Sequence, residues 1–269
     1  MDRTFIFALL LLSLSATLCK YVYIQQQKTW NEALDYCRQF HTDLAPVSSN
    51  HDNNRLMKLA NYSSDFKWIG LKRDPINAGK WTWSGGAAVS KFFWAQGQPD
   101  HVSQTHGLIS NYQWHDIAAD KKLYFFCYRV VVVRERKTWQ EALEYCREHH
   151  RDLASITSDT EMLLIQRELQ KHGSTERVWT GLRFFPGGWL WVDKKKLSYQ
   201  AWGQEGQPEC PEVKLHCAAL QGTTFSLHAS AGTVHTNGTG SYGVNIAADV
   251  KEGVWAALDC AESLHFICY

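Results

Sequence analysis

One segment occurs twice in this sequence, and the repeat restricts the possible folds more than any other feature. The two copies are residues 28–38, KTWNEALDYCR, and residues 137–147, KTWQEALEYCR. In each copy Trp, Ala, Leu and Cys fall at positions i, i+3, i+4 and i+7, which places them on one helical face. A Thr followed three residues later by Glu is typical of a capping box at a helix start. Each copy therefore predicts a capped helix that its cysteine attaches to a core.

The similarity between the copies continues well beyond this helix. HTDLA at 41–45 matches HRDLA at 150–154, and WIGL at 68–71 matches WTGL at 179–182. The 12 tryptophans also form six matching pairs: Trp30 and Trp139, Trp68 and Trp179, Trp81 and Trp189, Trp83 and Trp191, Trp94 and Trp202, Trp114 and Trp255. Two copies of one domain are the simplest explanation, and each has an ordinary domain size. We expect domains at 20–128 and 129–269, which abut because no Gly, Pro or Ser linker separates them.

Residues 1–19 have the pattern of a secretory signal peptide. Arg3 precedes an apolar run that ends at small residues, so we expect cleavage near Cys19 and Lys20. The run is shorter than a membrane span, which needs about 20 apolar residues, and the sequence contains no second apolar run of this kind. The protein is thus predicted to be secreted, without a membrane anchor. The 28 Lys and Arg residues nearly balance the 27 Asp and Glu residues, which argues against nucleic acid as the partner.

Each copy predicts an α+β domain with two helices, small antiparallel sheets and a long loop region. Val130 to Val133 is expected to start the first strand of copy two. Ser158 and Glu161 predict a further capping box, at the second helix of that copy. Between Cys217 and Trp255 copy two has a long insert rich in Gly, Ser and Thr, where copy one passes directly from Gly107 to Trp114. We expect this insert to form a surface excursion or a hairpin.

These motifs, in this order and in both copies, resemble the C-type lectin domain. The features are the Trp-x-Glu-Ala-x-x-Tyr-Cys helix, the Trp-Ile-Gly-Leu strand, the Gln-Pro-Asp tripeptide at 98–100, and the Trp-x-Asp tripeptide at 114–116 before a closing Phe-Phe-Cys. The resemblance covers residues 20–269. It implies an extracellular binding protein that is not an enzyme, and no nucleophile motif, Gly-rich phosphate loop or His-Glu-x-x-His sequence points to catalysis.

The resemblance also implies a pattern of disulfides. The implied pairs are Cys37 with Cys127, Cys146 with Cys268, and Cys217 with Cys260. Copy one has Gly107 and Ala119 where the last pair stands, so it lacks that bridge. Cys210 is left over once the signal is removed, and two states are open for it: a free thiol, or an intermolecular disulfide that makes a covalent dimer.

In sugar-binding members of the family a calcium ion joins the protein to two sugar hydroxyls. The resemblance places Gln98, Asp100 and Asp116 at calcium-ligand positions of copy one, but Thr105 and His115 replace a Glu and an Asn there. Calcium prefers about six to eight oxygen ligands, so we expect weak calcium binding or none. Copy two has Gln207-Pro208-Glu209, Leu215 and Ala256-Ala257 at the same positions, and no calcium site is expected there.

Three histidines close to these positions in copy one suggest a second hypothesis, a zinc site. His101, His106 and His115, with Asp100 and Asp116, would suit zinc better than calcium if the loop brought them together. The alternative is a degenerate calcium site whose histidines face solvent.

We therefore predict a carbohydrate-binding or glycoprotein-binding protein whose ligand contacts lie in copy one. The expected ligand-binding residues are Gln98, Asp100, Trp114, His115 and Asp116. The alternative is calcium-independent binding of a protein ligand through the loop surfaces of either copy. Asn61 and Asn237 stand in glycosylation sequons.

Overall fold

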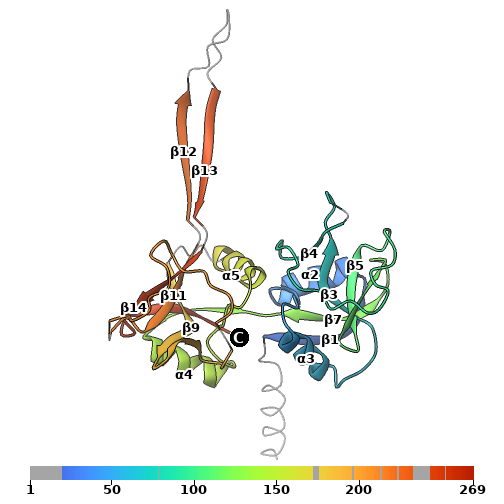
Figure 1. Cartoon of the computed structure of the whole chain (residues 1–269), viewed down its shortest axis with the longest axis horizontal. Coiled ribbons are helices and arrows are strands. Elements are labelled where there is room, and N and C mark those ends of the chain that lie inside the picture. Colours follow the sequence, from blue (N-terminus) through green and yellow to red (C-terminus); the bar gives the residue numbers. More distant parts are fainter. Residues whose placement is uncertain are drawn as a thin grey trace, which may run out of the picture.

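The protein folds into two halves that lie side by side, with the C terminus between them (Figure 1). The structure is a computed structural model that describes residues 20–77, 79–171, 176–195, 197–212, 214–222, 224–232, 243–251 and 253–269. The predicted signal peptide and the sequon at Asn237 lie outside these residues. The α+β architecture predicted from the sequence is confirmed.

The first half is built on a seven-stranded sheet with the strand order β1-β7-β3-β5-β6, to which β2 adds beside β7 and β4 beside β3. Strand β7 is antiparallel to β1 but parallel to β3, so the sheet is mixed. The elements in chain order are β1 (Tyr21–Lys28), α2 (Trp30–Phe40), β2 (Asp43–Leu44), α3 (Asn50–Leu59), β3 (Lys67–Arg73), β4 (Trp81–Trp83), β5 (His106–Ser110), β6 (Gln113–Ile117) and β7 (Leu123–Tyr128).

The second half repeats this plan with a six-stranded sheet in the order β14-β11-β9-β15-β8, with β10 beside β9. Strand β15 again lies parallel to the core strand β9, as β7 does to β3. The elements are β8 (Val131–Lys137), α4 (Trp139–His149), α5 (Asp159–Lys171), β9 (Arg177–Phe185), β10 (Gly188–Trp191), β11 (Cys217–Gln221), β12 (Thr224–Gly232), β13 (Gly243–Lys251), β14 (Val254–Leu258) and β15 (Leu264–Cys268).

Both repeated helices begin at the predicted capping boxes. The Thr29 hydroxyl accepts a hydrogen bond from the Glu32 backbone, and the Glu32 carboxylate accepts one from the Thr29 backbone. Thr138 and Glu141 make the same reciprocal pair in α4. The third predicted box forms only in part. The Ser158 hydroxyl caps the Glu161 amide, but the Glu161 carboxylate accepts hydrogen bonds from Thr157 and contacts Lys20 instead of returning to Ser158.

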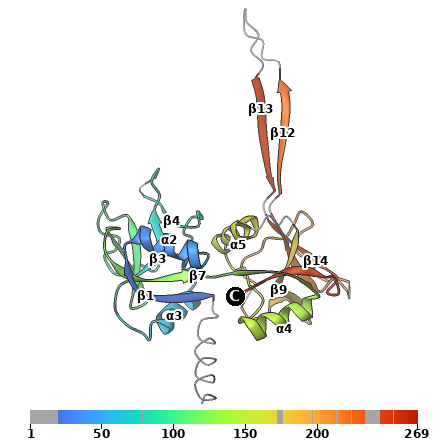
Figure 2. The ribbon, with the colours of Figure 1, turned by 180° about the vertical axis from the view of Figure 1, so that it is seen from behind.

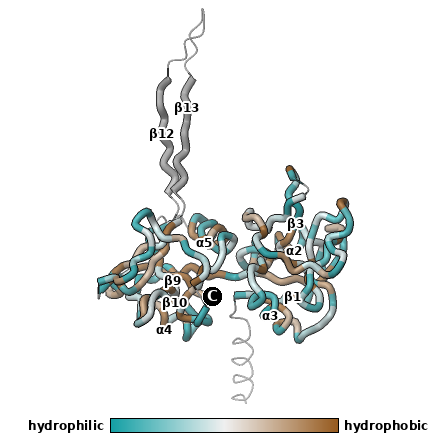
Figure 3. The backbone as a smooth tube through the Cα atoms, viewed as in Figure 1, coloured by the Kyte–Doolittle hydropathy of each residue, from teal (hydrophilic) through white to brown (hydrophobic). Residues whose placement is uncertain are grey.

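The core of each half is anchored at a disulfide. Cys37–Cys127 lies among the buried residues of one apolar cluster, and Cys146–Cys268 among those of another. The third bridge, Cys217–Cys260, is also present. Figure 3 shows the apolar segments gathered inside each half. Because the first helix and the last strand are distant in sequence, each long-range bridge restricts the unfolded chain strongly.

The two halves are in direct contact, as the absence of a linker indicated. One apolar cluster contains buried residues from both, among them Met57 of α3 and Leu164 of α5. A Cβ added at Gly85 of the first half would lie 2.9 Å from a methyl carbon of Leu164, so the Leu164 side chain packs closely on the Gly85 backbone. The hydroxyl oxygens of Tyr128, which ends β7, and Tyr269, which follows β15, lie 3.3 Å apart.

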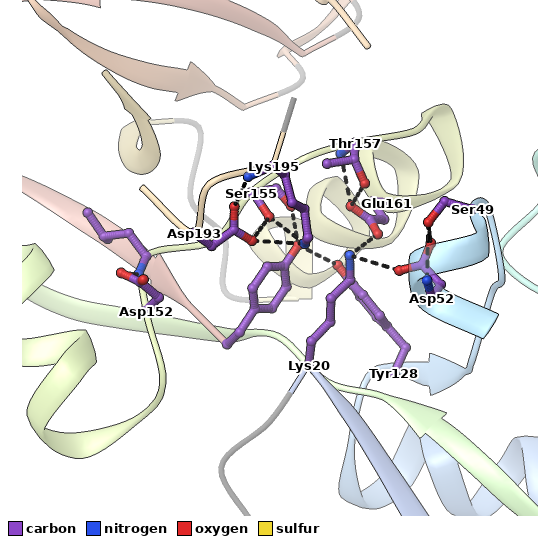
Figure 4. A network of polar contacts seen from close by, with 12 residues as sticks. Lys20, Ser49, Asp52, Tyr128, Asp152, Ser155, Thr157, Glu161, Asp193 and Lys195 are labelled. Atoms are coloured by element: carbon purple, nitrogen blue, oxygen red, sulfur yellow. Dashed lines mark hydrogen bonds and ion pairs between the residues drawn. The ribbon is translucent and has the colours of Figure 1, made fainter. Parts of the chain in front are cut away.

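The junction also contains buried charges (Figure 4). Lys20 contacts Glu161 of α5, and its ammonium lies 4.0 Å from Asp52 of α3. The Arg167 guanidinium of α5 lies 3.0 Å from the fully buried Asp43 carboxylate of the first half. Charged contacts between the halves therefore supplement the apolar ones.

The insert of the second half forms the expected hairpin. Strands β12 and β13 pair with each other in a two-stranded antiparallel sheet and with no other named strand. Figure 2 shows this pair projecting away from the rest of the domain. The inserted strands therefore add to neither of the two larger sheets.

Candidate functional site

The loop region of the first domain is organised by an arginine at the end of strand β3. The Arg73 guanidinium donates hydrogen bonds to the backbone carbonyls of Gln104 at 2.9 Å and His101 at 3.1 Å. It also lies 3.3 Å from the Asp116 carboxylate on β6. Its flat face lies 4.6 Å from the centre of the Trp81 ring. The Arg73 side chain thus connects the loop at 101–104 with strand β6 and the Trp81 ring.

Gln98 and Asp116 are in contact with each other, and Asp100 joins them through its backbone. The Asp116 amide donates to the Gln98 side-chain oxygen at 3.1 Å, and the Asp100 amide donates to the Asp116 carboxylate at 3.1 Å. The Gln98–Pro99 peptide bond is cis. The Asp116 side chain is fully buried, whereas Asp100 is exposed. Asp100 is therefore the carboxylate of this group that a ligand in solvent can reach.

The other two predicted ligand-binding residues lie elsewhere. Trp114 is fully buried and packs edge-to-face on Trp83, with ring centres 5.5 Å apart. His115 is next to Asp116 on a strand, so its side chain points to the opposite face, where its ring lies 5.7 Å from that of Phe66. In this structure neither ring adjoins Asp100.

The histidines proposed as zinc ligands are not brought together. His101 makes a hydrogen bond of 2.7 Å with Ser103, and His106 packs on Trp30 with ring centres 4.4 Å apart. Burial, and secondarily the positive charge of Lys72, lowers the pKa of His106 to about 4. Within the described residues no group of three or more His, Cys, Asp or Glu side chains is arranged to hold a metal ion.

The donor set of the first domain does not fit calcium. A calcium ion needs oxygen ligands with free lone pairs, but Asp116 already accepts bonds from the Arg73 guanidinium and the Asp100 amide. The Gln98 oxygen is used by the Asp116 amide. The Arg73 guanidinium already supplies a positive charge beside the Asp116 carboxylate, and a second cation there would be repelled.

At the matching place the second domain has a mainly apolar pocket of about 740 Å³. Leu215, Ala256 and Ala257, which replace the calcium ligands, all line it. Its wall also contains Trp202, Pro208, Pro211, Val254 and Trp255. Glu205 is the one carboxylate among the lining residues. These side chains can bind an apolar group, but they provide too few oxygens for a metal ion.

Arg73 is the residue of the first site that sequence reasoning missed. It lies two residues after the recognised core motif at 68–71. The comparison of the two copies contains a signal, because Phe184 and Ala257 of copy two stand where Arg73 and Asp116 stand in copy one, so the arginine and the carboxylate are present or absent together. The contact between the Arg73 and Asp116 side chains themselves could be recognised only in the folded protein.

Two other predicted sites lie on the surface. Cys210 is an exposed free cysteine, and its role in a dimer stays a prediction. Asn61 is exposed in the turn after α3, where a glycan would extend into solvent. Glycosylation of Asn61 likewise stays a prediction.

Comparison with known proteins finds one family in both halves. The family model Lectin C-type domain matches residues 26–129 and 135–269. Human C-type mannose receptor 2 is 23% identical over 235 residues, which cover 71% of this chain and 16% of the receptor. A snaclec chain of Echis carinatus, named as a coagulation factor IX/factor X-binding protein, is 35% identical over 95 residues, which cover 31% of this chain and 70% of that protein.

Among solved structures, human lithostathine is similar to part of the chain. Its crystal structure shares 25% identity and a TM-score of 0.38, covering 40% of this chain and 81% of lithostathine. No helix within the described residues has the length and apolar character needed to cross a membrane.

Proposed function

Because this chain belongs to the C-type lectin domain family, we propose that it is an extracellular recognition protein that binds carbohydrate through the first domain without calcium. The observation that carries the proposal is the Arg73–Asp116 pair, 3.3 Å apart, at the centre of the loop site. In a calcium-dependent site the ion orders the loop, whereas here a guanidinium of this chain contacts the loop and Asp116. A site ordered in this way is expected to tolerate removal of divalent ions.

Some residues of this site position the loop, and others contact the ligand. Arg73 and Asp116 are buried and position the loop, while the exposed Asp100 carboxylate accepts hydrogen bonds from sugar hydroxyls. The Gln98 amide lies at the rim, partly exposed, with its NH₂ group available as a donor. No residue of the group is arranged as a nucleophile with a base, so the proposal is binding without catalysis.

The test is a glycan array, probed with and without a chelator. We expect a glycan signal that the chelator leaves unchanged, that Asp100→Asn abolishes, and that Asp120→Asn preserves. Asp120 is a matched control because it is an exposed carboxylate of the same domain outside this loop. A signal that disappears with the chelator, or one that Asp100→Asn leaves intact, would contradict the proposal.

A second candidate function is favoured by the apolar pocket of the second domain. A pocket of about 740 Å³ lined by Leu215, Val254 and Trp255 is suited to an apolar side chain of a protein ligand. The snaclec relative is named as a binder of coagulation factors, which shows that a protein with this domain is described as a protein binder.

This second candidate can be tested by blocking the pocket. Secreted proteins displayed on an array are probed in parallel with the wild type, with Ala257→Arg, and with the control Ala261→Arg on an exposed turn. A partner that binds the wild type and the control but not Ala257→Arg supports the candidate. If every partner binds all three proteins equally, the pocket is not the binding site.

A further inference from the structure

A basic cleft of about 720 Å³, here called the junction cleft, lies between the two domains on the side of α3. His51, Arg55 and Lys58 line it from α3, where their spacing of four and three residues places them on one helical face. Arg151 lines it from the second domain, just after α4. The described residues that line the cleft include four basic side chains and no carboxylate.

Carboxylates nearby do not cancel this charge. A smaller hollow of about 100 Å³ shares His51, Arg55 and Arg151 with the cleft and adds Asp152 and Asp193. Each of these acids already has a cation of its own. The Asp193 carboxylate lies 2.9 Å from the Lys195 ammonium, and Asp152 lies 3.2 Å from the Arg147 guanidinium. Basic side chains without a carboxylate among them line the cleft itself, which gives it a positive potential.

Arg55 gives the most direct indication of a missing partner. Its Nη2 atom is buried and has no hydrogen-bond acceptor among the described residues. A buried guanidinium nitrogen without an acceptor is unfavourable, and an anion in the cleft would supply one. Asp52, the acid of the same helix nearest in sequence, is directed to Lys20 and Ser49.

The rest of the lining is suited to a sugar ring. Tyr62 and Tyr112 are 59% and 41% exposed and present aromatic faces beside the cations. Both have positive φ angles, 58° and 65°, so the two turns carrying them are held in a conformation that costs free energy. Asn54 and Asn61 add side-chain amides, which both donate to and accept from hydroxyl groups.

We propose that the junction cleft binds a sulfated or carboxylated oligosaccharide. Arg55, Lys58 and Arg151 contact the anionic groups, while Tyr62 and Tyr112 contact the ring. This site uses different elements from the loop site of Asp100. It also requires both domains, since α3 belongs to the first and Arg151 to the second.

Binding of a fluorescent heparin tetrasaccharide to the full secreted protein, followed by fluorescence anisotropy, tests the proposal. Charge-assisted hydrogen bonds are about twice as strong as neutral ones, so the double variant Arg55→Gln/Lys58→Gln is expected to bind about tenfold more weakly or worse. Lys121→Gln, which changes an exposed lysine outside the cleft, is expected to bind as the wild type does. Affinity is also expected to fall as salt is raised, whereas uncharged maltotetraose should not compete.

Asn61 requires a separate variant in this experiment, because a glycan attached to this residue of the cleft would block access of the oligosaccharide. Asn61→Gly removes the sequon and suits the positive φ of 49° at that position. Thermal unfolding of each variant verifies folding, and the exposed Lys58→Gln change alone gives a second variant with little effect on the fold.

Three results would overturn the proposal. The first is no heparin binding by either the wild type or Asn61→Gly. The second is an equal loss of affinity in Lys121→Gln, which would show general charge attraction. The third is tighter binding of a sulfotyrosine peptide than of the tetrasaccharide, which would identify an acidic protein as the ligand.

Discussion

The side chain of Lys20, in the first domain, contacts that of Glu161, in the second, and both are about 1% exposed. Burial by itself lowers the pKa of Lys20, but attraction to Glu161 and then to Asp52 outweighs this and raises the pKa above its ordinary value. The lysine is therefore charged in the folded protein. The pair connects the residue before β1 to α5 across the junction, and each of the two charges has a partner of opposite sign.

Glu161→Gln is expected to destabilise the protein strongly. The change leaves buried Lys20 with only the more distant Asp52 carboxylate, 4.0 Å away, and breaking a buried ion pair costs about 3 to 5 kcal/mol. The matched control is Glu176→Gln, whose pair with Arg136 is about half exposed, 51% and 52%. That change is expected to cost about 1 kcal/mol or less. Urea unfolding measures both, and equal effects would show that the junction pair contributes no more than a surface one.

Arg73→Gln is expected to loosen the loop of the first domain. Asp116 is fully buried and would lose its cation, so we expect a destabilisation of about 3 kcal/mol and faster amide exchange across 98–105. Adding Asp116→Asn should recover part of the loss, because it removes the unpaired charge. Lys80→Gln, at an exposed position, serves as the control. If Arg73→Gln leaves amide exchange in the loop unchanged, Arg73 does not order it.

The repeated helices and disulfide-anchored cores could be predicted because they depend on local patterns. The capping residues and the apolar spacing each extend over only one or two helix turns, so the residues from Thr29 to Cys37 are enough to predict the helix. The duplication then supplied the domain plan, since motifs present twice in the same order indicate two copies of one domain.

The functional arrangements were harder to predict because they depend on long-range contacts. Arg73 and Asp116 are 43 residues apart, and no local pattern pairs them. Glu161 departs from its predicted capping role because Lys20 approaches from the other domain. His115 and Asp116 are adjacent in sequence yet lie on opposite faces of β6, so proximity along the chain did not imply a shared site.

His106 is expected to make the stability of the first domain depend on pH. Its folded-state pKa is about 4, below the unfolded value of about 6.5, so the unfolded chain takes up a proton first as the pH falls. Stability should therefore decrease as the pH falls from about 6.5 to about 4, by about 1 to 2 kcal/mol after allowance for partial solvent exposure.

Urea unfolding at several pH values measures this dependence, and His106→Gln should reduce it over the same window; burial also lowers the pKa of His41 to about 4, so part of the dependence should remain. His149→Gln is the control because His149 is an exposed histidine outside the first domain. An unchanged slope in His106→Gln would mean that another group carries the pH dependence.

Restoring the missing disulfide of the first domain is expected to fail. Gly107 and Ala119 occupy the positions of Cys217 and Cys260, but a Cβ at Gly107 would lie 2.4 Å from a methyl carbon of Leu71. Gly107→Cys with Ala119→Cys should thus overpack the core, lowering stability by about 1 to 3 kcal/mol and leaving both thiols reduced. Adding Leu71→Ala makes room, so the triple variant should form more of the bridge. Thiol titration of the purified proteins measures this, and a fully formed bridge in the double variant would show that Leu71 does not exclude it.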